Sequence, residues 1–239
     1  MKAKDRLIFP LDFPDLDQTL YWVERLNPFI GVFKVGLELY SKYGPRTVED
    51  IRRISSAKIF LDLKLHDIPN TISGAVKALS NLGVDFLTIH VLSGRRALEE
   101  AVKASHGGLK ILGVTILTSL DRADLLELGF NGELATQIDE LAFKMALLAS
   151  VTNCDGIVTS AKEVERIKGA LPHLLTIVPG IRMEESPKDD QLRVATPYEA
   201  ILKGADYLVV GRPIRESSQP EKICEAILND IDRALEKRL

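Results

Sequence analysis

Short apolar runs rich in β-branched and aromatic residues recur along the whole chain, and each is followed by a stretch with the apolar spacing of an amphipathic helix. This alternation is typical of parallel βα units rather than of hairpins. The eight predicted strands are centred on Leu7-Ile8-Phe9, Val32-Phe33-Lys34, Ile59-Phe60-Leu61, Phe86-Leu87-Thr88, Leu112-Gly113-Val114, Gly156-Ile157-Val158, Leu175-Thr176-Ile177 and Tyr207-Leu208-Val209. With 239 residues, the chain is predicted to form one α/β domain over residues 1–239, a single (β/α)8 TIM barrel, whose usual length is about 250 residues.

The helical stretches have the pattern of helices that cover a barrel from outside. Ile72, Val76 and Leu79, for example, recur at steps of three and four residues. A doubly wound open sheet is the alternative architecture, but it normally has a G-x-G-x-x-G turn after its first strand. This chain has Pro10-Leu11-Asp12-Phe13-Pro14 at that point, which favours the closed barrel.

Composition narrows the classes of function. The formal net charge of -3, from 31 basic and 34 acidic side chains, gives no general attraction for nucleic acid or for anionic membranes. No segment has the apolar length of a signal peptide or a membrane span, so a cytoplasmic protein is expected. Cys154 and Cys224 match no metal-ligand spacing and are expected to be buried, reduced thiols. The four histidines are scattered, which makes a zinc site an unfavoured interpretation.

A cluster of charge follows the third predicted strand, where Asp62, Lys64 and Asp67 lie within six residues of one another. Side chains two apart in a strand share a face, so Asp62 and Lys64 are expected to point the same way. The neighbouring leucines at 61, 63 and 65 would then pack on the other side. A salt bridge that closes the end of a strand explains a lone Asp-x-Lys equally well.

Polar residues also follow the other strands, and in a barrel the active site lies at the carboxyl ends of the strands. Asp12 follows strand one, where two interpretations are open: a turn residue, or a residue of the active site. Lys34 lies within the apolar second strand, where a buried ammonium needs a counter-ion. Thr118 and Ser119 follow strand five as helix caps or ligand contacts, and His90 is interpreted as a core histidine.

The far side of the same rim has the composition of an anion site. Strand seven runs into Pro179-Gly180-Ile181-Arg182 and strand eight into Gly211-Arg212-Pro213. Barrels commonly bind phosphate through these two loops, where glycine admits an oxygen and arginine holds it bidentately. The polar segment from Met183 to Pro197 is predicted to be a lid, with an ordinary surface loop as the alternative.

Taken together, these motifs resemble those of the orotidine 5′-phosphate decarboxylase family over nearly the whole chain. The central block is Asp62-Leu63-Lys64-Leu65-His66-Asp67-Ile68-Pro69-Asn70-Thr71. The other matching segments, in family order, are Pro10-Leu11-Asp12, Phe33-Lys34-Val35-Gly36, Leu117-Thr118-Ser119, Pro179-Gly180-Ile181-Arg182, Asp190-Gln191 and Val210-Gly211-Arg212-Pro213. The resemblance implies a barrel of the ribulose-phosphate-binding type.

The resemblance implies decarboxylation of orotidine 5′-monophosphate to UMP, the last step of de novo pyrimidine synthesis, without metal or organic cofactor. Lys64 would protonate the carbanion left at C6, with Asp62, Asp67 and Lys34 as the other catalytic charges. A magnesium-dependent phosphosugar decarboxylase or aldolase of the same superfamily is one alternative, although its metal-ligating glutamate on strand two is replaced here by Lys34. A non-catalytic sensor of phosphoribosyl ligands is the other.

The resemblance also implies the binding residues and the assembly. Substrate would be bound by Asp12, Lys34, Asp62, Thr71, Thr118, Ser119, Pro179, Arg182, Gln191, Gly211 and Arg212. Asp12 and Lys34 would contact the ribose hydroxyls, and Thr118 or Ser119 the pyrimidine edge. Gln191, Arg212 and the Gly211 amide would contact phosphate. Asp67 and Thr71 would reach the site of a neighbouring subunit, which implies a homodimer.

Overall fold

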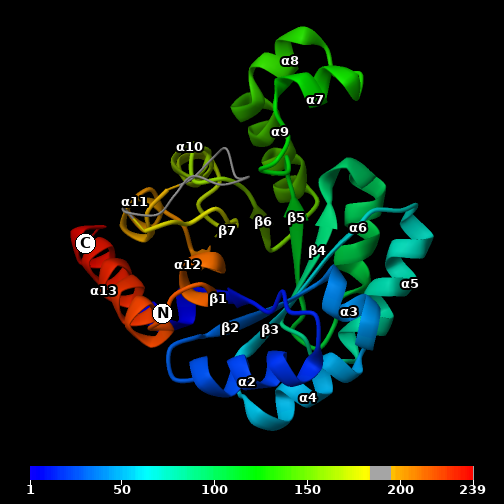
Figure 1. Cartoon of the computed structure of the whole chain (residues 1–239). Helices are drawn as coiled ribbons and strands as arrows, with labels where there is room; N and C mark the ends of the chain where they lie inside the picture. The colour runs from blue at the N-terminus through cyan, green and yellow to red at the C-terminus, as the bar shows by residue number, and fades with distance from the viewer. Residues whose placement is uncertain (184–194, 239) are drawn as a thin grey trace.

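Eight parallel strands close into a barrel in sequence order (Figure 1). The computed structural model describes residues 1–183 and 195–238. The strands are β1 (Leu7–Pro10), β2 (Val32–Gly36), β3 (Lys58–Leu65), β4 (Phe86–His90), β5 (Lys110–Val114), β6 (Gly156–Val158), β7 (Leu175–Val178) and β8 (Tyr207–Val209). Each predicted strand centre lies within one of them, so the prediction of a (β/α)8 barrel is confirmed.

Helices surround the barrel in an outer ring (Figure 1). They are α1 (Ala3–Arg6), α2 (Leu16–Leu26), α3 (Leu37–Tyr43), α4 (Arg46–Ile54), α5 (Pro69–Ser80), the 3-10 helix η1 (Val91–Ser93), α6 (Arg95–Ala104), α7 (Arg122–Glu127), α8 (Gly132–Thr136), α9 (Ile138–Val151), α10 (Val164–Ala170), α11 (Pro197–Leu202), α12 (Arg212–Arg215) and α13 (Pro220–Arg238). The short helices α7 and α8 project beyond the ring between β5 and α9. Within the described part of the chain, no helix has both the length and the apolar character needed to cross a membrane.

Two apolar cores fill the molecule. The outer core lies between strands and helices, and the inner core fills the barrel with Ile8, Val32, Phe60, Phe86, Leu112, Ile177 and Tyr207. Phe86 packs edge-on against Phe60 and Tyr207, with ring centroids 6.0 Å and 5.4 Å apart. These aromatic rings support the site above them, because Phe60 also lines the cavity at the carboxyl ends of the strands.

The same hydrogen-bonding pattern recurs at the amino ends of three strands. An aspartate lies directly before each of β4, β6 and β8, namely Asp85, Asp155 and Asp206. Each carboxylate accepts a main-chain N–H of the preceding strand. The three donors are Ile59 at 2.8 Å, Ile111 at 2.9 Å and Thr176 at 2.9 Å. Each also meets a basic side chain, namely Arg52, Lys110 and Lys168 respectively.

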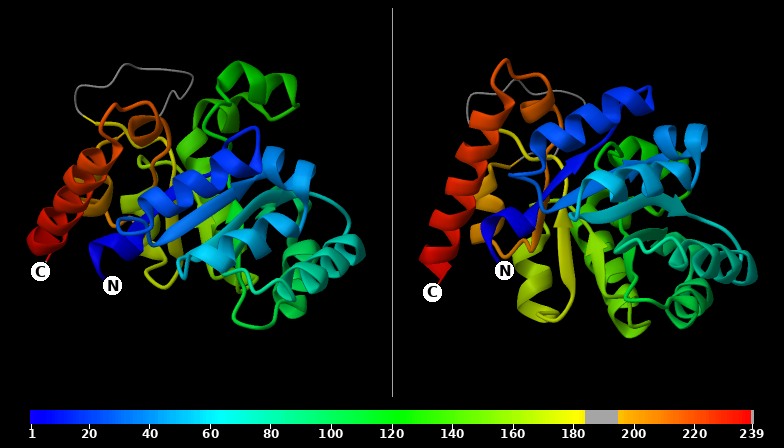
Figure 2. Two further views of the ribbon diagram at one scale, coloured as in Figure 1. Left: turned by 60° about the horizontal axis from the view of Figure 1, so that its bottom comes forward. Right: turned by 90° about the horizontal axis from the view of Figure 1, so that it is seen from below.

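The position before β2 is Gly31 instead. A Cβ added there would lie 2.5 Å from the Lys4 carbonyl oxygen, because α1 packs against this end of the barrel. The helix α1 lies beside α13, and both ends of the chain are found at this side of the barrel (Figure 2). At the amino end of the barrel, aspartates therefore connect the pairs β3–β4, β5–β6 and β7–β8, and the helix α1 packs against the pair β1–β2.

We expect Asp206→Ala to lower the free energy of unfolding by about 2–3 kcal/mol, because a buried main-chain N–H and a threonine hydroxyl lose their acceptor. Urea unfolding followed by circular dichroism measures this change. Asp232→Ala, at an exposed position of α13, is the control and should change stability by less than about 0.5 kcal/mol. Equal values for the two variants would contradict a structural role for Asp206.

Candidate active site

The third strand is irregular at the point where it enters the site. Leu61 pairs with Leu87 and Leu65 with Ile89, so Asp62, Leu63 and Lys64 lie opposite one residue of β4. Lys64 has φ +48°, a left-handed conformation that is uncommon outside glycine. The bulge places Asp62 and Lys64 on the cavity, while Leu63 and Leu65 pack against the outer core.

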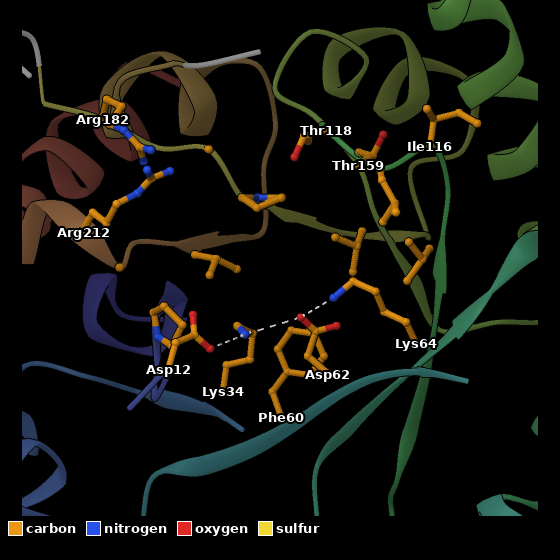
Figure 3. Close-up of a pocket in the computed structure, with 18 of the residues that line it drawn as sticks. Asp12, Lys34, Phe60, Asp62, Lys64, Ile116, Thr118, Thr159, Arg182 and Arg212 are labelled. Carbon is orange, nitrogen blue, oxygen red and sulfur yellow. Dashed lines mark hydrogen bonds and ion pairs between the residues drawn. The ribbon is translucent and has the colours of Figure 1, made fainter. Parts of the chain in front are cut away.

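Four charged side chains form a line across the floor of the cavity (Figure 3). Lys34 Nζ lies 3.3 Å from Asp12 Oδ1 and 3.5 Å from Asp62 Oδ2, and Lys64 Nζ lies 2.8 Å from the same Asp62 Oδ2. The exposed fraction of the side chain is 11% for Lys34, 12% for Asp62 and 31% for Lys64. Gly36 leaves room for the line, since a Cβ there would lie 3.1 Å from Asp12 Oδ1. Acid and base thus alternate, and each lysine has a carboxylate partner.

The two innermost charges hold each other in the ionised state. Burial raises the pKa of the Asp62 carboxyl, but the ammonium groups of Lys34 and Lys64 together lower it by more than burial raises it. The net pKa of Asp62 therefore lies below its ordinary value. Burial lowers the pKa of Lys34, but Asp62 and Asp12 outweigh it, and the net pKa lies above its ordinary value. Asp62 and Lys34 therefore both stay charged across the neutral pH range.

The lowered pKa of Asp62 makes a prediction for stability. Its contribution is present above the unfolded pKa of about 3.9 and is lost as the pH falls through the lower folded pKa. The free energy of unfolding of the wild type should therefore fall more steeply below about pH 4 than that of Asp62→Asn. Urea unfolding at a series of acid pH values tests this, with Asp67→Asn as the exposed control. Parallel curves for wild type and Asp62→Asn would contradict the expected pKa.

These charges face a cavity of about 490 Å³ at the carboxyl ends of the strands, a volume within the range of small-molecule sites. Arg182 and Arg212 extend into it from the side of β7 and β8, across from Lys64 (Figure 3). Thr118 and Ile116 approach from the loop after β5. The site thus has a wall with two arginines, a floor of alternating charge, and a wall after β5 with one hydroxyl and one apolar side chain.

The predicted site residues divide into three groups. Those that line the cavity are Asp12, Lys34, Asp62, Lys64, Thr118, Pro179, Arg182, Gly211 and Arg212. Ser119, Asp67 and Thr71 are exposed and lie outside it. Gln191 and most of the predicted lid from Met183 to Pro197 lie outside the described residues.

The position of Asp67 follows from the chain path beyond β3. Its Oδ1 accepts the N–H of Ile68 at 2.6 Å, so the carboxylate turns toward the start of α5. Within one chain the array at Lys64 therefore has three further charges, Asp12, Lys34 and Asp62, and Asp67 is not among them.

Sequence reasoning missed three residues near the site. Thr159 lines the cavity at the end of β6, and the signal that marked Thr118, a threonine following a strand, was present there too. Arg215 lines the cavity one helical turn after Arg212, and its Nη1 donates to the Asp12 carbonyl oxygen at 3.1 Å. Thr88 lies behind the floor, where its hydroxyl contacts both Asp62 and the main chain of Lys64.

The cysteines and histidines considered as candidates have surroundings typical of structural residues. Among residues 1–183 and 195–238, no group of three or more His, Cys, Asp or Glu side chains is placed to hold a metal ion. Burial raises the pKa of the Cys154 thiol to about 11 and that of Cys224 to about 12, and both are free, as predicted. The His90 ring lies 5.4 Å from the His66 ring, and burial lowers the His90 pKa.

A closed barrel that gathers alternating acids and lysines and a pair of arginines around one cavity defines a (β/α)8-barrel enzyme with its site at the carboxyl ends of the strands. Comparison with known proteins gives its family. The chain belongs to the orotidine 5′-phosphate decarboxylase / HUMPS family, whose model matches residues 5–227.

Curated relatives and solved structures agree with this assignment. The chain is 44% identical to orotidine 5′-phosphate decarboxylase of Methylococcus capsulatus, over 92% of this chain and 89% of that protein. It is 41% identical to the enzyme of that name from Moorella thermoacetica, over 97% and 94% respectively. The crystal structure of orotidine 5′-phosphate decarboxylase from Lactobacillus acidophilus superposes with a TM-score of 0.81 at 32% identity, covering 95% of this chain and 98% of that one.

Proposed function

We propose that this protein decarboxylates orotidine 5′-monophosphate to UMP, the last step of de novo pyrimidine synthesis, without metal or organic cofactor. The observation that carries the proposal is the line Asp12, Lys34, Asp62 and Lys64 on one side of a cavity whose opposite wall holds Arg182 and Arg212. Membership of the decarboxylase family supports the same assignment.

Lys64 is the proposed general acid. When the bond between C6 and the carboxyl carbon breaks, CO₂ leaves and the electron pair stays on C6. An ammonium beside that carbon stabilises the developing negative charge and then transfers its proton to C6. The Lys64 amine regains a proton from solvent. Asp62, at 2.8 Å from Lys64 Nζ, holds the ammonium in place on the cavity.

The arginine wall suits the phosphate of the substrate. Guanidinium groups bind phosphate oxygens bidentately. Gly211 lines the same wall, and its main-chain amide is the further proposed phosphate contact. An added Cβ at Gly211 would lie 2.8 Å from Pro10 Cγ, so only glycine fits the approach of β8 to β1. Binding energy at the phosphate would orient the pyrimidine over Lys64, far from the phosphate itself. The phosphate contact of Gln191 and the lid stay predictions.

The other contacts follow the layout of the cavity. Asp12 and Lys34 stand between the arginine wall and Lys64, which is where the ribose of a bound nucleotide would lie. Of the two hydroxyls proposed for the pyrimidine edge, Thr118 lines the cavity and Ser119 is exposed, which favours Thr118. Pro179 contributes to the apolar part of the lining.

We also propose that the active unit is a homodimer in which Asp67 and Thr71 enter the site of the other subunit. Both residues are exposed in one chain. Apolar side chains are exposed at the carboxyl ends of three successive strands: Leu37 after β2, Ile68 after β3 and Leu92 after β4. Ile68, next to Asp67, is 66% exposed. Large apolar side chains gathered at one edge are typical of a surface that another protein covers.

An ultraviolet assay that follows the loss of orotidine 5′-monophosphate, with and without EDTA, tests the function. Turnover that is unchanged by EDTA is expected. Activity on a phosphosugar that EDTA abolishes and Mg²⁺ restores would favour the magnesium-dependent lyase instead. Tight binding of UMP with no turnover of either substrate would favour the sensor.

A further inference from the structure

Thr88 occupies the one position of β4 that lies opposite the bulge of β3. Its neighbours on β4, Leu87 and Ile89, pair with Leu61 and Leu65, so three residues of β3 face this one threonine. Thr88 is fully buried and lies behind the cavity floor. Because it is buried, its hydroxyl must find its hydrogen-bond partners within the protein, and the bulge lies beside it.

The Thr88 hydroxyl bonds to the bulge on both sides. It accepts the main-chain N–H of Lys64 at 2.9 Å and donates its single hydrogen to Asp62 Oδ1 at 3.0 Å. A hydroxyl has one hydrogen to donate and lone pairs that accept, so these two bonds use it in complementary roles. One side-chain atom thus connects the backbone of Lys64 to the carboxylate of Asp62.

The first bond supports an unfavourable backbone. In a regular parallel pair the Lys64 N–H would bond to a carbonyl of the neighbouring strand, and the bulge removes that arrangement. An unpaired buried N–H costs about 1–3 kcal/mol, and the left-handed φ of +48° at Lys64 adds to the cost. The Thr88 oxygen supplies the acceptor and so holds Lys64 in this conformation.

The second bond fixes the rotation of the Asp62 carboxylate. With Oδ1 bonded to Thr88, Oδ2 faces both Lys64 Nζ at 2.8 Å and Lys34 Nζ at 3.5 Å. A carboxylate free to rotate would not keep one oxygen between the two ammonium groups. The direction of both lysine side chains therefore depends on the Thr88 hydroxyl, which holds Asp62 Oδ1.

We propose that Thr88 is a positioning residue for the reaction, which sets the backbone of Lys64 and the carboxylate of Asp62 through one hydroxyl without touching substrate. The inference rests on the proposed decarboxylase function of the same site. It predicts that removal of the hydroxyl misplaces the Lys64 ammonium while the arginine wall still binds the phosphate of the nucleotide.

Thr88→Val is the decisive variant, because it keeps the shape of the side chain and removes the hydroxyl. Thr88→Ser restores the hydroxyl and is the rescue variant. Thr176→Val is the matched control: Thr176 is also fully buried in a strand and donates to an aspartate, Asp206, at 3.2 Å, but at the amino end of the barrel. If Thr88→Val does not fold, Thr88→Ala, which adds no volume, takes its place.

We expect Thr88→Val to lower kcat by about tenfold or more while the Kd for UMP changes by less than about threefold. Thr88→Ser should return kcat to within about threefold of the wild type. Thr176→Val should lose stability with kcat within about twofold. A kcat for Thr88→Val no lower than that for Thr176→Val, or a loss of UMP binding equal to the loss of kcat, would overturn the inference.

Crystal structures of the wild type and of Thr88→Val give a readout that needs no turnover. In the variant, Lys64 should leave the left-handed region or its Nζ should move beyond about 4 Å from Asp62 Oδ2, the limit of an ion pair. Lys64 and Asp62 kept in their wild-type positions would overturn the inference even if the wild type is a decarboxylase. A wild type without turnover would overturn the proposed function, and the structural comparison would still decide the role of Thr88.

Discussion

Lys64→Ala is expected to abolish turnover of orotidine 5′-monophosphate, with a loss in kcat of at least about 10⁴-fold. Proton transfer by a positioned acid contributes about 10²–10⁴-fold, and the charge of the ammonium at the developing carbanion adds to this. Binding of UMP should persist, because Arg182 and Arg212 lie on the opposite wall of the cavity. Ultraviolet assays give kcat, and titration calorimetry with UMP gives the affinity.

Lys58→Ala is the matched control for this experiment. Lys58 begins the same strand, at the amino end of the barrel, and its Nζ lies over the Phe86 ring rather than in the cavity. Its replacement should leave kcat within about twofold of the wild type. A Lys64→Ala variant with near-native kcat would show that another group donates the proton.

Asp67→Ala is expected to lower kcat by about 10²-fold or more, although Asp67 lies outside the cavity of its own chain. In the proposed dimer its carboxylate completes the charges around Lys64 of the other subunit. Asp17→Ala, at an exposed position of α2, is the control and should keep full activity. Steady-state assays of the two variants measure the effect.

Mixing the two inactive variants, Lys64→Ala and Asp67→Ala, gives the sharper test of a shared site. After co-refolding at equal amounts, half of the dimers are hybrids, and each hybrid has one site with both native residues. Activity should therefore return to about one quarter of the wild-type value. No recovery in a mixture shown to contain hybrids, or full activity of Asp67→Ala alone, would contradict the exchange of Asp67 between subunits.

The barrel could be predicted because its signals are local. Each strand is a short apolar run and each helix a stretch with its own periodicity, so neither depends on knowing which strands pair. The charges at Asp12, Lys34 and Asp62 could be placed on one rim for the same reason, since all parallel strands end on one side. The single domain over residues 1–239 stays a prediction.

The bulge in β3 could not be predicted, because it exists only in the pairing with β4. Strand alternation led to the expectation that Asp62 and Lys64 share a face; both do line the cavity, but through three residues opposite Thr88 and a left-handed Lys64. Thr88 carried no signal in the sequence, since a threonine within a strand is ordinary. Arg215 was missed because its role depends on where α12 lies relative to Asp12.

The left-handed conformation of Lys64 means that the backbone and the side chain favour different residues at this position. Glycine adopts φ +48° without steric cost, whereas a residue with a side chain loses roughly 1–2 kcal/mol there. Glycine at position 64 would remove this backbone cost, but it would also remove the ion pair with Asp62 and the proposed acid. Engineering of a more robust form of this protein should hold position 64 fixed and seek its stability at the amino end of the barrel.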